Sequence, residues 1–136
     1  PLWWVCVNPI MPMTAGALIY RLAPHLPGWR LALVIAHMGM PEYAEFLDIC
    51  TEHDNVHLDT TMAFTAFAEA TMPTPPEVLR KLPDLDGRVV FGSDFPNIPY
   101  DYATAMSAIT GLPGVDDAWL RGVFYGNAAR LFKLSG

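Results

Sequence analysis

The fold of this chain is decided by residues 88–96, which read Arg88-Val89-Val90-Phe91-Gly92-Ser93-Asp94-Phe95-Pro96. A short apolar segment of strand type is followed by a glycine and then by an aspartate. In parallel α/β folds, loops and helix N-termini meet at the carboxyl ends of the strands, and catalytic side chains gather there. Asp94 is therefore placed to bind a metal ion or to transfer a proton. The alternative is structural, with Ser93 or Asp94 capping the next helix or turn.

Strand-like and helix-like segments alternate along the whole chain. The segment Leu31–Ala36 is apolar on both faces, as parallel strands covered by helices are. The pattern predicts strands over Leu2–Val7, Leu31–Ala36, Asn55–Asp59 and Val89–Phe91, and helices over Ala15–Leu22, 41–52, Ala63–Ala70, 74–81, Tyr102–Thr110 and Asp116–Phe132, the last broken near Gly126.

This alternation predicts an α/β fold of parallel strand–helix units in one partial domain, residues 1–136. Four such units make half of a (β/α)₈ barrel, which takes about 250 residues, or a small open sheet. The sequence contains neither G-x-G-x-x-G nor G-x-x-x-x-G-K-S/T, so no phosphate-binding fingerprint supports the open sheet.

Composition excludes several classes of protein. The chain has 136 residues, 52% of them hydrophobic and 16% charged, and a net charge of -6, which disfavours nucleic acid as a partner. Its apolar stretches are interrupted before membrane-spanning length, and we expect no signal peptide. Cys6 and Cys50 are typical of buried thiols in a reducing compartment, which predicts a cytoplasmic protein. Because an apolar strand directly follows Pro1, we expect the natural beginning of the protein to lie upstream or to have been removed.

Polar side chains stand at the carboxyl end of every predicted strand. Asn8 follows the first strand, His37 the second and Asp94 the fourth, while Asp59 ends the third. One polar residue in such a place is unremarkable, but four at one edge of a sheet form a candidate active site.

The chain resembles the amidohydrolase superfamily, in the amidohydrolase-2 group that includes amino-carboxymuconate-semialdehyde decarboxylase and related aromatic-acid decarboxylases. The resemblance covers essentially the whole chain and implies the C-terminal half, strands five to eight, of a metal-dependent-hydrolase TIM barrel. The matching segments are Val34–Gly39 (VIAHMG), Asn55–Thr61 (NVHLDTT), Val90–Pro96 (VFGSDFP) and Gly126–Leu134 (GNAARLFKL).

The resemblance implies a role for each matching residue. Asp94 matches the strand-eight aspartate, which binds the metal and takes a proton from its bound water. His37 matches the strand-six histidine, an acid/base or polarising group in the decarboxylase branch and a metal ligand in other branches. The implied cofactor is a divalent metal, Zn²⁺ or Mn²⁺, because such an ion lowers the pKa of bound water toward about 7 and a nearby imidazole can carry its proton.

The sequence also departs from the family pattern. The usual strand-five histidine ligand is replaced by Asn8, whose amide oxygen is a poorer zinc ligand. Cys6, two residues away, is a further ligand candidate. The strand-one His-x-His pair is absent, so the chain alone is expected to hold a metal incompletely or to hold none.

The remaining candidates are predicted to be structural. His25 lies in a proline-rich connection, His53 at a helix end, and His57 in mid-strand, where a packed side chain is more common than a ligand. Arg130 is expected to pair with a carboxylate. Trp119 and Met38 are expected to pack in the core.

Two functions remain open. In the first, the chain is the C-terminal half of a metal-dependent hydrolase or decarboxylase of a small carboxylic or cyclic substrate, completed by a complementary N-terminal half. In the second, it is an inactive half-barrel that acts as a binding or assembly module. Because a half-barrel leaves two sheet edges unpaired, both predict a companion half-barrel chain or a homo-oligomer.

Overall fold

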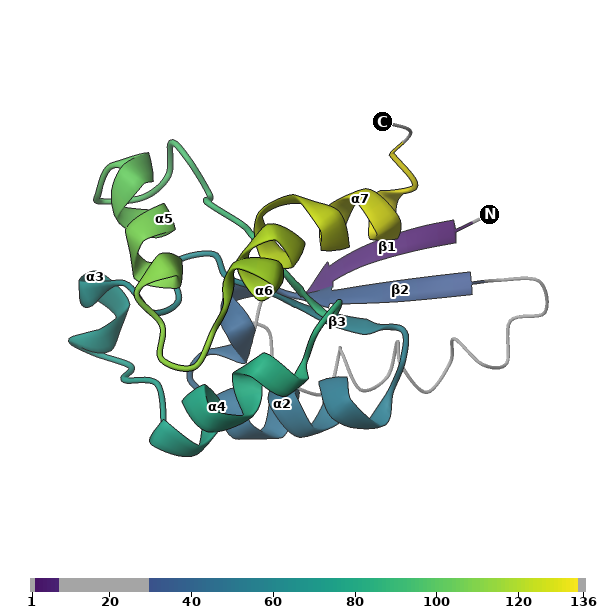
Figure 1. Ribbon diagram of the computed structural model, residues 1–136, viewed down its shortest axis with the longest axis horizontal. Helices are drawn as coiled ribbons and strands as arrows, with labels where there is room; N and C mark the ends of the chain where they lie inside the picture. The colour runs from purple at the N-terminus through teal and green to yellow at the C-terminus, as the bar shows by residue number, and fades with distance from the viewer. Residues whose placement is uncertain (1, 8–29, 135–136) are drawn as a thin grey trace.

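The computed structural model describes residues 2–7 and 30–134, with the backbone alone at residues 2–7, 30 and 31. Figure 1 shows how the elements are arranged. In chain order they are strand β1 (Leu2–Val7), strand β2 (Arg30–Ile35), the short helix η2 (Ala36–Gly39), α2 (Tyr43–Glu52), β3 (Val56–Asp59), α3 (Ala66–Glu69), α4 (Pro76–Lys81), η3 (Leu82–Asp84), β4 (Val89–Val90), α5 (Tyr102–Thr110), α6 (Asp117–Arg121), the π-helical η4 (Gly122–Gly126) and α7 (Asn127–Phe132).

The described strands form one parallel sheet in the order β1-β2-β3-β4. The register pairs Val34 with His57 and Leu58 with Val89. The predicted α/β fold with parallel strands is confirmed, and strand boundaries differ from the predicted ones by one residue where they differ. The predicted helix Ala15–Leu22 lies outside the described residues. The predicted helix Ala63–Ala70 is shorter, since it begins only after Thr65, whose hydroxyl caps it.

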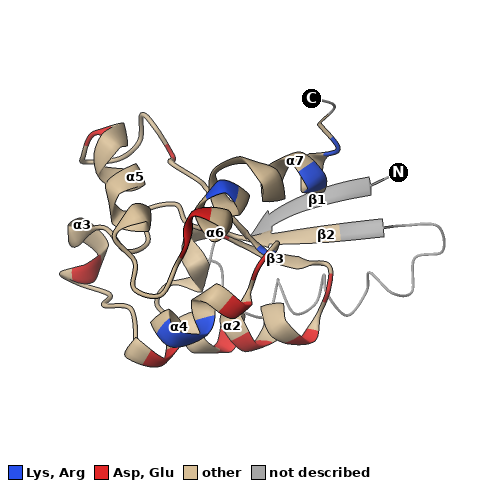
Figure 2. Cartoon of the chain, in the orientation of Figure 1, with Lys and Arg blue, Asp and Glu red and all other residues tan. Residues whose placement is uncertain are grey.

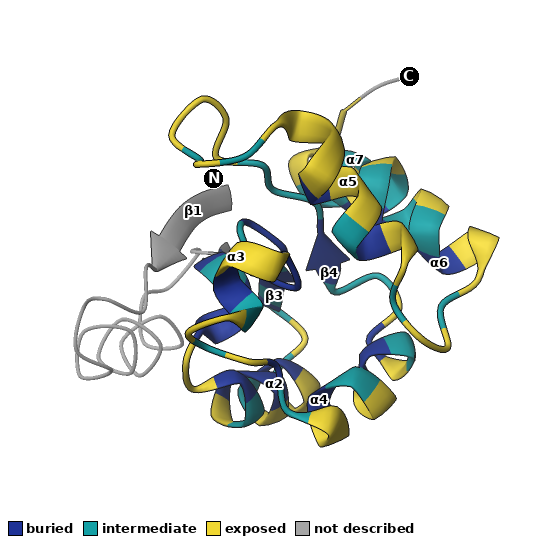
Figure 3. Cartoon of the chain, turned by 90° about the vertical axis from the view of Figure 1, so that its left-hand side faces the viewer, coloured by how far each residue is buried: buried dark blue, intermediate teal, exposed yellow. Residues whose placement is uncertain are grey.

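Period-2 alternation in the strands decides what the helices cover. Val56 and Leu58 are fully buried, whereas His57 and Asp59, between and after them, are half-buried. Helix α2 packs on the apolar face because its buried residues recur at helical spacing: Tyr43, Phe46, Leu47 and Cys50. Figure 3 shows buried residues on the inner sides of α2 and α4 and exposed residues on their outer sides.

Cys50 is fully buried in this layer, as its sequence position predicted. Its thiol lies 3.4 Å from the carbonyl oxygen of Val56, and burial raises the pKa of Cys50 to about 11. The thiol is therefore neutral at physiological pH and packs as a small apolar side chain.

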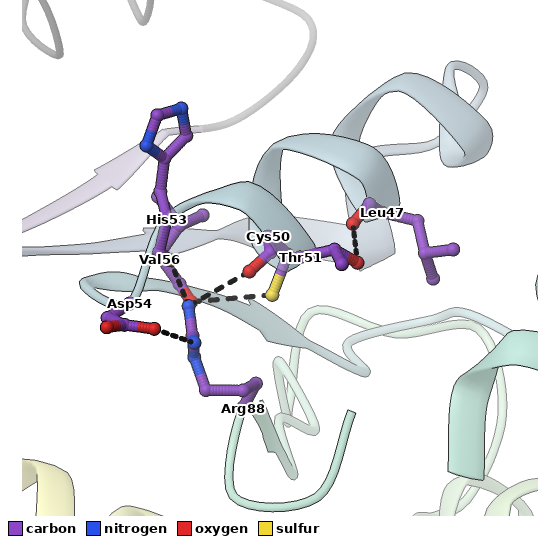
Figure 4. Close-up of polar contacts among 7 residues, drawn as sticks. All are labelled: Leu47, Cys50, Thr51, His53, Asp54, Val56 and Arg88. Carbon is purple, nitrogen blue, oxygen red and sulfur yellow. Dashed lines mark hydrogen bonds and ion pairs between the residues drawn. The ribbon is translucent and has the colours of Figure 1, made fainter. Parts of the chain in front are cut away.

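The guanidinium of Arg88 fastens α2 to the sheet (Figure 4). Its Nε donates to the carbonyl of Val56 at 3.0 Å. Its Nη2 donates to the backbone carbonyl of Cys50 at 3.0 Å and also to the carbonyl of His53. Nη1 lies 3.5 Å from the exposed carboxylate of Asp54. Carbonyls at a helix C-terminus lack partners within the helix and carry partial negative charge, so the partly buried guanidinium both donates hydrogen bonds to them and balances their charge.

The free side of β4 is hydrogen-bonded to the last helical segments. The Phe91 amide donates to the carbonyl of Val123 at 3.0 Å, and the buried Asn127 side chain donates to the carbonyl of Val89 at 2.7 Å. β4 pairs with no further strand among the described ones, as predicted for an edge of the sheet, but these two groups on that side are already hydrogen-bonded. Arg130 hydrogen-bonds to the Asn127 side-chain oxygen rather than to the predicted carboxylate, because one helical turn brings these two side chains together.

Charged residues are unevenly distributed over the helices. Figure 2 shows acidic residues along α2 and on α3, whereas α4 carries both signs, with Glu77 in its first turn and Arg80 and Lys81 in its last turn. In residues 2–7 and 30–134, no helix has the length and apolar character needed to cross a bilayer.

Replacing Arg88 by methionine, which keeps most of the stem but removes the guanidinium, is expected to destabilise the chain by about 2–4 kcal/mol. The reason is that the carbonyls of Cys50, His53 and Val56 lose their donor in a largely buried place. Urea denaturation followed by circular dichroism measures the change.

The matched control is Lys81→Met, which removes a cation paired with Asp48 at 3.2 Å between exposed side chains. An exposed pair contributes about 0–1 kcal/mol, so this variant should unfold close to wild type. Equal midpoints for Arg88→Met and Lys81→Met would contradict the assigned role of Arg88.

Candidate active site

The carboxyl ends of β2, β3 and β4 meet at one edge of the sheet. In Figure 1, α3 and α5 lie beyond this edge. The edge is held by backbone bonds past the strands themselves: the Thr60 amide donates to Val90 at 3.0 Å, and the Gly92 amide donates to the Thr60 hydroxyl at 3.3 Å. The candidate residues His37, Asp59 and Asp94 follow or end these three strands, as predicted.

The His37 side chain is oriented by the end of β3. Its Nδ1 lies 3.1 Å from the carbonyl oxygen of Thr61. A carbonyl only accepts hydrogen bonds, so Nδ1 carries the proton and Nε2 of the neutral ring keeps its lone pair. Nε2 is therefore the atom of this half-buried imidazole that can take up a proton or bind a metal.

The loops at this edge have an unusual backbone. Six described non-glycine residues have positive φ, and the five that follow strand ends are His37, Met38, Met62, Phe64 and Asp94. L-residues adopt this conformation at a cost of about 1–3 kcal/mol each, and such residues cluster at functional sites. Met38 is 1% exposed, so it fills the core as predicted while its backbone turns the chain at His37.

Gly92 allows β3 and β4 to approach closely at this edge. A Cβ at this position would lie 2.2 Å from Thr61 Oγ1 and 3.2 Å from Asp59 Oδ1. Only a residue without a side chain fits between these groups, so the glycine before Ser93 serves packing as well as the turn.

Asp94 is exposed, with φ of 50°. Its carbonyl accepts the amide of Asn97 at 2.7 Å, and the neighbouring Ser93 hydroxyl accepts the amide of Phe95 at 3.3 Å. The next helix, α5, is capped instead by Asp101. Helix capping therefore does not account for Asp94, and its carboxylate points to no hydrogen-bond donor among the described residues.

Tyr100 is a residue at this edge that the sequence analysis missed. Its hydroxyl is buried and has no well-formed hydrogen bond to any described residue. Burial raises the pKa of Tyr100, the adjacent Thr65 side chain lowers it, and the negative charge of Asp94 raises it again. The phenol thus lies near Asp94 in a neutral state. No motif marks it, because a lone tyrosine in a loop carries no signal of its own.

The structure describes only some of the other predicted residues. Asn8 and His25 lie outside the described residues, and at Cys6 the structure gives only the register, opposite Val34. His57 packs in mid-strand as expected. Its pKa is lowered by burial and by the charge of Arg88, and its buried Nδ1 has no partner among the described residues. Trp119, 6% exposed, packs in the core as predicted.

Metal binding by these residues alone is not supported. Among residues 2–7 and 30–134, no three side chains of histidine, cysteine, aspartate or glutamate are grouped so that they could hold an ion. A catalytic zinc takes three protein ligands. His37 and Asp94 are thus at most part of a ligand set.

Known proteins similar to this chain were found by a family model and among solved structures. A family model described as Amidohydrolase matches residues 6–134. The crystal structure of the 5-carboxyvanillate decarboxylase LigW from Sphingomonas paucimobilis is similar to this chain, with a TM-score of 0.62 and 21% sequence identity. The match covers 93% of this chain and 41% of that chain, so the chain spans less than half the length of this neighbour. The comparison with curated proteins found no match.

Gly92→Ala is expected to destabilise the chain by about 1–3 kcal/mol, because its Cβ would overlap the Thr61 hydroxyl. The double variant Thr61→Ala/Gly92→Ala should recover part of that loss, since it removes the overlapping oxygen. Thermal unfolding of the two single variants and the double variant measures the coupling.

The control is Gly126→Ala, where a Cβ would make only ordinary contacts, with the nearest atom 3.5 Å away. This helical position should be neutral or gain up to about 1 kcal/mol. Additive effects of Thr61→Ala and Gly92→Ala would show that these two groups are not in contact.

Proposed function

Because this chain belongs to the amidohydrolase family, we propose that it is the C-terminal half of a metal-dependent hydrolase or decarboxylase. The family resemblance predicted from the sequence is confirmed by the match over residues 6–134. The chain covers 41% of a decarboxylase of the same fold, and its parallel strands lie side by side in sequence order. Both features are expected of four consecutive strand–helix units from one side of a barrel.

The observation that carries this proposal is the orientation of His37. Its Nδ1–H is engaged by the Thr61 carbonyl, which leaves Nε2 as a proton acceptor at the same sheet edge as Asp94. We assign to His37 the transfer of a proton to or from a small carboxylic or cyclic substrate, and to Asp94 the binding of a metal or of its water. A histidine is suited to this work because its ordinary pKa lies near neutrality.

The metal that the family uses does not fit the described residues by themselves. Its remaining ligands have to come from elsewhere. We propose Zn²⁺ or Mn²⁺ as the ion, held by Asp94, by His37 in a weaker role, at the position of Asn8, and by side chains of a complementary N-terminal half.

One observation favours the second candidate function, an inactive half-barrel that binds or assembles. It is the same lack of a complete ligand group among the described residues. Both functions call for a companion. β1 is the terminal strand of the sheet and pairs only with β2 among the described strands, so its outer side is where a further strand would add.

The decisive experiment compares the chain alone with the chain co-expressed with the coding sequence immediately upstream, the natural place for a half-barrel bearing the His-x-His pair. We expect the complex to retain close to one equivalent of Zn or Mn by elemental analysis and to decarboxylate or hydrolyse a member of a panel of aromatic carboxylates. Asp94→Asn should lower retained metal at least tenfold. Asp117→Asn, an exposed aspartate on α6, is the matched control and should change nothing.

A complex without metal, or one in which Asp94→Asn keeps both metal and activity, would overturn the enzyme proposal in favour of the binding module.

The companion is tested separately by the mass of the chain in solution. We expect the isolated chain at micromolar concentration to form dimers or larger species in light scattering, because β1 ends the sheet. A monodisperse monomer would count against a required companion or homo-oligomer.

A further inference from the structure

We propose that Asp59 is a positioning residue for His37, which it holds in the form with a proton on Nδ1 and a free lone pair on Nε2. This inference rests on the proposed function in so far as His37 is the proton-transfer group. It adds a residue to which no role in that reaction has been assigned above, and a reason why the imidazole is already set before substrate arrives.

The argument begins at one carboxylate oxygen. Asp59 Oδ1 accepts the backbone amide of His37 at 3.1 Å and the backbone amide of Thr61 at 2.9 Å. Thr61 in turn accepts His37 Nδ1 on its carbonyl at 3.1 Å. Asp59 therefore holds both ends of the histidine, its backbone directly and its ring through Thr61. The three hydrogen bonds thus form a closed cycle that joins His37, Asp59 and Thr61, although His37 and Asp59 are 22 residues apart in the sequence.

The backbone of His37 needs such an anchor. Its φ of 57° and ψ of 31° lie in the left-handed region, which a non-glycine residue keeps only when the surroundings impose it. A hydrogen bond that the His37 amide donates to a carboxylate contributes more than one donated to a neutral acceptor. Without it, the turn would relax and the ring would leave the Thr61 carbonyl.

The hydrogen bonds of Asp59 allow the position of its oxygen to be tested separately from its negative charge. Both amides bind Oδ1, and no described group donates to Oδ2. An asparagine can present its carbonyl oxygen at the place of Oδ1 and its NH₂ at the place of Oδ2 without meeting another donor. Asp59→Asn should therefore keep the arrangement, whereas Asp59→Ala should lose it.

The carboxylate also has little freedom to move. It lies over the bare backbone of Gly92, where even a methyl group would come within 3.2 Å of Asp59 Oδ1 and Cγ. This packing leaves the oxygen in one place, which is what a positioning role requires.

The test is ¹⁵N-histidine NMR on the full chain at a pH where the ring is neutral, with the His37 signals assigned by a His37→Gln variant. In wild type we expect Nδ1 to be protonated and Nε2 unprotonated. Asp59→Asn should give the same spectrum. Asp59→Ala should show exchange between the two tautomers and at least tenfold faster hydrogen exchange of the His37 amide. Asp117→Ala is the control and should match wild type.

A wild-type ring protonated on Nε2, or an Asp59→Ala variant with unchanged tautomer and exchange rate, would overturn the proposal. If Asp59→Ala fails to fold, the wild-type tautomer and the Asp59→Asn spectrum still decide, because a shifted tautomer in Asp59→Asn contradicts the argument from Oδ1.

These readouts need neither substrate nor companion, so the two proposals can fail separately. A correct tautomer with no activity in the assembled complex removes the proposed reaction and leaves Asp59 as a positioning residue. In an active complex, Asp59→Ala should lower kcat at least tenfold with little change in KM, and Asp59→Asn should restore most of it. Full activity in Asp59→Ala would remove the positioning role and leave the reaction in place.

Discussion

The structure depends on one partly buried cation. Arg88 binds carbonyls at the C-terminal end of α2 and the carbonyl of Val56, at the start of β3. Val56 begins β3 and Asp59 ends it, so a bond that holds Val56 in place also sets the position of Asp59 along the strand direction. The oxygen that holds His37 is thus placed by an arginine at the opposite end of the same strand. The Arg88 hydrogen bonds and the hydrogen bonds of Asp59 are therefore connected through the four residues of β3.

The sequence predicted what local pattern determines. Apolar runs located the strands, helical spacing located α2, and the boundaries of α5 agree with Tyr102–Thr110. It could not predict the left-handed turn at His37, since that conformation is imposed by a residue 22 positions away. Arg130 is a second example. Its charge alone predicted a carboxylate partner, but in the fold its guanidinium hydrogen-bonds to the side-chain oxygen of Asn127. Asn8 stays a prediction, because it lies outside the described residues.

The candidate site combines a rigid part with an incomplete part. The His37 amide donates to the Asp59 carboxylate, and the His37 ring is bonded to the carbonyl of Thr61, whose amide donates to the same carboxylate, so these residues are held by protein groups alone. Asp94 is exposed and its carboxylate has no donor among the described residues, so it is the group that lacks its partners. The Tyr100 hydroxyl is buried and has no well-formed hydrogen bond to any residue in the described part of the chain. In the proposed function, the proton-transfer group His37 is held entirely by described residues, whereas Asp94 needs further ligands from elsewhere, as expected of a site shared between two pieces of protein.

The bonds that link β4 to the last helical segments have a consequence for how copies of this chain can assemble. A parallel sheet with both ends bare can add identical units head to tail without limit, which leads to fibres. Here the amide of Phe91 and the carbonyl of Val89 are already occupied by Val123 and Asn127. A strand that adds at β4, from a second copy or from a complementary half-barrel, therefore has to replace these two hydrogen bonds. β1 pairs only with β2 among the described strands, so the two sides of the sheet are not equivalent for assembly, and pairing at β4 is coupled to movement of the last helical segments.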